Sequence, residues 1–205
     1  MKTLFFSTAL IAVAAAVQPA SAQVRTAQFS LYPNPKFANC LENPASSDPP
    51  IAVARLIRGE LNDTLQLNVH NVKPNTAFDL FTVQNSQLLS NGQADPNFKN
   101  FGLAWYQSDV KSDESGDIEV QIHTIFLDQI FGFDPAVNLG PTNTFHVGFW
   151  FNNPKDAAAC GFDVTKPTPF NGEHRAGPLA MITVPDPHTN LGPLCTRPSG
   201  HSCIP

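Results

Sequence analysis

The sequence lacks the short motifs that would reveal a catalytic or metal-binding function directly. It has no CxxC, HxH or HExxH spacing and no GxSxG, so the common zinc, metalloprotease and serine-hydrolase signatures are absent. The isolated carboxylates Asp109, Asp128, Asp134 and Asp163 form no recognisable pair for glycoside hydrolysis. Only 14% of residues are charged, the net charge is -5, and no run of basic residues occurs. Nucleic acid and anionic membrane surfaces are therefore poor candidate partners.

Long apolar runs are also scarce, and the one that exists lies at the start of the chain. Lys2 precedes an apolar run over residues 4–17, and Ala20-Ser21-Ala22 follows as a small-residue cleavage site. Residues 1–22 are therefore predicted to be a secretory signal peptide. No later segment reaches the roughly 20 apolar residues that a transmembrane helix needs, so we expect no membrane insertion. The prediction is a secreted protein, extracellular or periplasmic, with a single domain after the signal peptide.

Cysteine is rare, and all four cysteines follow the predicted signal peptide. An even number in an oxidising compartment predicts two disulfides, and sequence alone permits three pairings. We favour Cys40–Cys160, which would attach the N-terminal part to the loop after a central strand. The second favoured pair, Cys195–Cys203, would close a small loop near the C-terminus.

Alternating apolar and polar residues predict β-strands over most of the central part of the chain. Residues 64–71 and 117–123 alternate regularly, and residues 52–58, 76–83, 101–106, 144–151 and 179–184 less so. Short turns join them, and the best helical candidates are residues 126–131 and a turn from Pro154 to Gly161. These patterns predict an all-β fold, a single-domain antiparallel β-sandwich of jelly-roll or immunoglobulin-like form. The sandwich would span residues 51–185, between a Pro-rich arm (23–50), expected to lie outside the sheet, and a Pro/Gly-rich tail (186–205).

Three histidines fall on the polar faces of three different predicted strands. His70, His123 and His146 would bind zinc or copper if the fold brought them together, because neutral imidazole is a common metal ligand. Their spacing matches no metal motif, so independent surface histidines are the alternative, and no cofactor is the favoured expectation.

One compact charged cluster lies in a glycine-flanked loop. Glu173 or His174 would serve as a general base there, and Arg175 would hold an anionic group. The alternative is an ion pair between Glu173 and Arg175 that braces the loop.

Aromatic residues supply the candidate ligand-binding surface. Phe145, Val147, Phe149 and Phe151 share one face of the strand over residues 144–151 and are predicted to be core. Trp150 lies on the opposite face with His146, and Gly148 between them would leave room for a flat ligand. Trp105 and Tyr106 are further candidates, although the core is the favoured position for Trp105 and an equal alternative for Trp150. Asn62 begins the sole N-glycosylation sequon, Asn62-Asp63-Thr64, at a predicted turn.

These features favour a secreted, non-catalytic protein that binds a small molecule, a carbohydrate or an extracellular surface. An enzyme acting on a small molecule in an aromatic pocket is the alternative, either metal-dependent through the strand histidines or metal-free through Glu173, His174 and Arg175. A structural envelope or wall protein is a third interpretation.

Overall fold

The computed structural model of the protein describes residues 26–59, 62–124, 144–166, 168 and 176–195. Its regular structure is nearly all antiparallel β-sheet, which confirms the all-β prediction. The elements in chain order are β1 (Thr26–Pro33), α1 (Ala38–Leu41), β2 (Ile51–Ile57), β3 (Asp63–His70), β4 (Ala77–Val83), β5 (Ala104–Lys111), β6 (Ile118–Thr124), β7 (Thr144–Phe151), the 3₁₀ helix η2 (Pro154–Cys160), β8 (Leu179–Thr183) and β9 (Leu194–Cys195).

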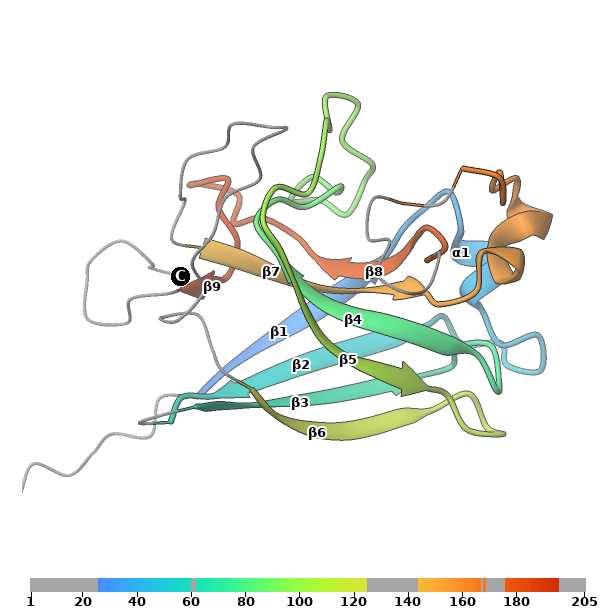
Figure 1. Ribbon diagram of the computed structural model, residues 1–205, viewed down its shortest axis with the longest axis horizontal. Helices are drawn as coiled ribbons and strands as arrows, with labels where there is room; N and C mark the ends of the chain where they lie inside the picture. The colour runs from blue at the N-terminus through green and yellow to red at the C-terminus, as the bar shows by residue number, and fades with distance from the viewer. Residues whose placement is uncertain (1–25, 60–61, 125–143, 167, 169–175, 196–205) are drawn as a thin grey trace, which may run out of the picture.

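Eight strands form one hydrogen-bonded path in the order β5-β4-β7-β8-β1-β2-β3-β6, and β9 pairs with β7 outside this path. Figure 1 shows β1, β2, β3 and β6 in one layer, with β4, β5, β7 and β8 in a second. The two end strands, β5 and β6, are consecutive in the chain. A tight turn joins them, in which the backbone N–H of Asp113 donates to the carbonyl of Asp117 at 2.9 Å. The path is therefore nearly closed.

Apolar residues at every second position of β3 and β6 explain why the two strands pair with the same face turned toward the core. Leu65, Leu67 and Val69 are buried on β3, whereas the side chains between them are only partly buried. The register places Leu67 opposite Val120 of β6, so apolar side chains of the two strands share a face. A one-residue slip would turn this whole set outward, and the alternation therefore fixes the register.

The main core lies between the two layers, and β7 contributes the residues predicted for it. Phe145, Val147, Phe149 and Phe151 are all buried there. Phe149 packs edge-on against Phe78 of β4, with ring centroids 5.1 Å apart. The prediction that these four side chains of β7 face the core is confirmed.

The stretch before residue 50 differs from the prediction of an arm outside the sheet. Residues 26–33 form β1, which pairs with β2 along most of its length and with β8 at its end. The prolines that suggested an arm begin only at Pro33, where the strand ends. Leu31 is buried and Phe29 packs partly buried against the core, whereas most other side chains of β1 are exposed, so the apolar alternation is too short to reveal the strand.

The predicted Cys40–Cys160 disulfide is present and links α1 to the end of η2. Phe37 and Phe162 pack edge-on beside it, with ring centroids 5.9 Å apart. The predicted turn at residues 154–161 is also confirmed. The Asn153 side chain accepts from the N–H of Lys155 at its start, and Gly161 ends it with a φ of 84°.

Candidate functional site

The outer face of β7 carries His146 and Trp150, as expected, but this face is not open to solvent. His146 is 2% exposed and Trp150 is fully buried. A second apolar cluster covers the strand here, formed by Val83, Leu88, Phe101, Trp150, Leu179 and Ile182. The covering residues Leu88 and Phe101 come from the long connection between β4 and β5. The prediction that the indole of Trp150 is available to a ligand is therefore wrong.

The space beside Gly148 is also filled by the protein itself. A Cβ added at Gly148 would lie 3.0 Å from the Ile182 side chain, because Ile182 of β8 sits opposite this residue. The rings of Phe81 and Phe101 pack edge-on against Trp150 at 5.5 and 5.0 Å. Gly148 thus permits close strand packing and leaves no slot for a flat ligand.

A cavity of about 600 Å³ lies next to this covered face. Two segments enclose it: the β4–β5 connection and the stretch that follows β8, both on the β7 side of the molecule in Figure 1. The start of β7 contributes Thr144 and His146. The lining is Gln84, Asn85, Ser86, Leu88, Leu89, Asp95, Asn97, Phe98, Lys99, Asn100, Thr144, His146, Pro185, Asn190, Leu191 and Gly192.

His146 is the buried titratable side chain of this cavity. Its Nδ1 lies 3.0 Å from both the carbonyl oxygen and the hydroxyl oxygen of Thr183. A Cβ at Gly192 would clash with the carbonyl of Phe145 and approach the His146 ring to 3.0 Å, so the segment after β8 packs directly on this part of β7. The ring is therefore fixed from two sides.

Burial decides the charge of His146. Desolvation lowers its pKa from 6.5 to about 4, and the hydrogen bond with Thr183 only partly opposes this shift. The imidazole is consequently neutral at physiological pH. A group with so low a pKa is a weak general base near neutral pH, so the cavity suits binding better than proton transfer.

Trp105 and Tyr106 lie elsewhere, on β5, and neither lines the cavity. Trp105 is 40% exposed, so its interpretation as a core residue is wrong; Tyr106 is 51% exposed. The Tyr106 hydroxyl donates to Asp109 at 2.9 Å, and partial burial together with this carboxylate raises the pKa of the phenol. These two side chains remain available to a surface ligand, separate from His146.

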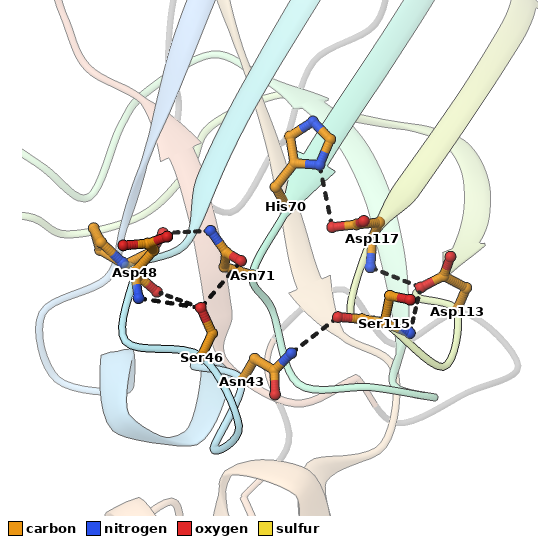
Figure 2. Close-up of polar contacts among 9 residues, drawn as sticks. Asn43, Ser46, Asp48, His70, Asn71, Asp113, Ser115 and Asp117 are labelled. Carbon is orange, nitrogen blue, oxygen red and sulfur yellow. Dashed lines mark hydrogen bonds and ion pairs between the residues drawn. The ribbon is translucent and has the colours of Figure 1, made fainter.

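His70 lies at the end of β3, within the polar network that Figure 2 shows, and it does not line the cavity. Its Nδ1 donates to the Asp117 carboxylate at 3.1 Å. In the same network the Asp113 carboxylate accepts from the N–H groups of Ser115 and Asp117, and Asn43 donates to the Ser115 carbonyl. Asn43 thereby ties the α1–β2 connection to the β5–β6 turn, and His70 ties the end of β3 to Asp117 just before β6, which is a structural role for this histidine.

The other two predicted metal ligands lie far from His70. His123 is exposed on β6, with Nδ1 3.1 Å from the Thr64 hydroxyl. His123 pairs with Thr64, six residues along β3 from His70, a separation of roughly 20 Å along the strand. His146 is buried on β7. The structure does not bring the three histidines together, and no group of three or more metal-ligating side chains occurs within its described ranges.

Three further predictions fall partly or wholly on residues outside the described ranges. The cluster of Glu173, His174 and Arg175 lies there, as do Cys203 of the favoured second disulfide and the helical candidate at residues 126–131. Cys195 itself forms the end of β9. Asn62 is exposed immediately before β3, which is an accessible position for the sequon.

Sequence reasoning missed most of the cavity, because its residues lie in segments without periodicity. Side-chain amides are concentrated in the stretch over residues 84–100, and this enrichment is the one signal that points to a polar binding loop. Nothing in the sequence pairs this stretch with residues 185–192.

The chain matches no protein-family model, no curated protein and no solved structure. In the described part of the chain, no helix combines the length and the apolar content that crossing a membrane requires. The Cys40–Cys160 disulfide is typical of proteins that fold in an oxidising compartment.

Proposed function

We propose that the protein is secreted and binds a small extracellular molecule, without catalysis, in the cavity between the β4–β5 connection and the segment after β8. The observation that carries this proposal is the cavity itself, with a buried neutral histidine in its lining. Its volume of about 600 Å³ falls within the range typical of small-molecule sites.

The chemistry of the lining supports binding of an uncharged molecule. Leu88, Phe98 and Leu191 provide apolar surface, and side-chain amides and hydroxyls provide donors and acceptors. Such a mixture is characteristic of ligand sites, in which apolar contact gives affinity and a few polar groups fix orientation. The two charged residues of the lining, Asp95 and Lys99, have opposite signs and do not favour ligands of either charge.

Binding is tested with a mixed panel of small molecules and a variant that fills the cavity. The panel contains glucose, galactose, N-acetylglucosamine, phenol, anisole, toluene, benzoate and benzylamine, and saturation-transfer NMR detects binding. Asn97 is exposed in the lining, and within the described part of the chain its side chain makes no hydrogen bond that Asn97→Trp would remove. The matched control is Gln93→Trp, an exposed residue of the same connection outside the lining.

We expect at least one compound to bind the wild type and Gln93→Trp but not Asn97→Trp. Absence of binding by every compound, or equal binding by both variants, would overturn the proposal. Secretion is tested separately by expressing the whole chain and sequencing the N-terminus of the exported protein. A start at Gln23 is expected, whereas retention of the intact chain inside the cell contradicts it.

A further inference from the structure

The contacts with Thr183 favour one tautomer of His146. The carbonyl oxygen of Thr183 can only accept, so this contact is satisfied in the tautomer that carries the proton on Nδ1, at 3.0 Å. The Thr183 hydroxyl oxygen lies at the same distance and also accepts from the backbone N–H of Val147 at 3.2 Å. In a neutral imidazole with a proton on Nδ1, Nε2 has a lone pair and no hydrogen.

Burial keeps the ring in this state at physiological pH. With 2% of the residue exposed, desolvation holds the pKa of His146 at about 4. Nε2 is therefore a hydrogen-bond acceptor and not a donor over the whole range above roughly pH 5.

Nε2 makes no hydrogen bond within the residues that the structure describes, and the ring lines the cavity. A ring nitrogen that makes no such hydrogen bond is expected to accept one from water or from a ligand in the cavity that the ring lines. The acceptor is thus available to a molecule that enters the cavity.

We propose that His146 is the specificity-determining residue of this cavity, and that its Nε2 accepts a hydrogen bond from a hydroxyl group of a neutral small molecule. This inference rests on the proposed function and narrows it to one ligand class. Sugars and aromatic alcohols share the required chemistry.

The lining explains why a neutral hydroxyl compound fits better than an ion. Carboxylates and phosphates present acceptor oxygens, which would face the Nε2 lone pair. Cations would lose hydration on entering, with only Asp95 among the lining residues to offset the loss. The apolar side chains of Leu88, Phe98 and Leu191 can contact the carbon skeleton of the ligand.

Two substitutions test the roles of the two ring nitrogens of His146 separately. The amide of His146→Asn can replace Nδ1 as donor to Thr183 but leaves nothing at the position of Nε2. His146→Gln reaches the position of Nε2 with its amide and retains an acceptor there. Both variants are checked for folding by circular dichroism, and His123→Gln, on an exposed histidine of β6, is the control.

The probes are phenol and its methyl ether anisole, methyl β-D-glucopyranoside as the sugar, and benzoate as the anion. We expect phenol or the glucoside to bind the wild type, and anisole and benzoate to bind roughly tenfold or more weakly, since each lacks the donor. His146→Asn should weaken binding of the hydroxyl compound by a similar factor, whereas His146→Gln and His123→Gln should retain most of it. Long-range ¹H–¹⁵N NMR of the histidines should show the proton of His146 on Nδ1.

The outcomes distinguish this inference from the proposed function. If anisole, toluene, benzoate or benzylamine binds as tightly as the hydroxyl compounds, or if His146→Asn binds them unchanged, the role of His146 is refuted and the cavity remains a binding site. A proton on Nε2 refutes it equally. If no compound of the whole panel binds the wild type, both proposals fail.

Discussion

Lowering the pH from neutral should destabilise the protein through His146. The folded protein keeps this ring neutral down to a pKa of about 4, whereas in the unfolded chain the pKa is near 6.5. The unfolded state therefore binds a proton first as the pH falls. The stability that His146 contributes is fully present above the unfolded pKa, and it is lost as the pH falls toward the folded pKa.

The size of this loss follows from the difference between the two pKa values. Each unit is worth about 1.4 kcal/mol, so the full difference corresponds to about 3 kcal/mol. Roughly 2 kcal/mol should already be lost between about pH 7.5 and pH 5. Because His146 is 2% exposed, solvent screening does little to reduce the figure. A domain with a stability of about 5–15 kcal/mol would show this change clearly.

The assay is urea unfolding at a series of pH values, with the disulfide intact. His146→Asn removes the titrating ring and should flatten the curve of unfolding free energy between about pH 6.5 and pH 4.5. His123→Gln removes an exposed imidazole and should follow the wild type. Hydrogen bonds to the carboxylates of Asp113, Asp163 and Asp186 hold their pKa values below the ordinary value for aspartate, so the stability that these groups contribute is lost only at lower pH.

One result would refute the reasoning. If the wild type and His146→Asn lose stability in parallel between about pH 6.5 and pH 4.5, the ring is not kept neutral by burial. The same result would remove the basis for treating Nε2 as a permanent acceptor.

Three further variants test the packing of the covered face of β7, the segment after β8 and the disulfide. Trp150→Ala should lower the free energy of unfolding, measured in urea, by about 3–5 kcal/mol, because this side chain is fully buried. Trp105→Ala, at an exposed tryptophan, should change it by less than about 0.5 kcal/mol. Similar losses for the two variants would contradict the burial of Trp150. Gly192→Ala should lower the melting temperature, at a cost of about 1–3 kcal/mol, because the added Cβ meets the Phe145 carbonyl; an unchanged melting temperature would show that this segment does not pack on β7. Replacing both Cys40 and Cys160 by alanine opens a loop with a sequence separation of 120. In the same urea assay this should lower the free energy of unfolding by at most about 5 kcal/mol. A loss under about 1 kcal/mol would show that the loop is constrained without the disulfide.

The sequence by itself determined the strands whose two faces differ. Leu65, Leu67 and Val69 could be assigned to the core because an alternating strand can turn only one of its two faces inward, and the other choice would expose every apolar residue. The same argument placed Phe149 and its partners on β7. The Cys40–Cys160 disulfide could also be predicted from the sequence, because four cysteines permit only three pairings.

Only the tertiary structure decided what happens on the second face of β7. Periodicity separates His146 and Trp150 from the core face, but it cannot tell a face open to water from one covered by another segment. Leu88 and Phe101, which cover it, lie in a connection whose apolar residues follow no regular period. The cavity at His146 likewise depends on residues some 100 positions apart in sequence. Local sequence patterns predict which residues share a face of a strand. The burial of a ring and its pKa depend instead on contacts that form only when segments distant in sequence pack together.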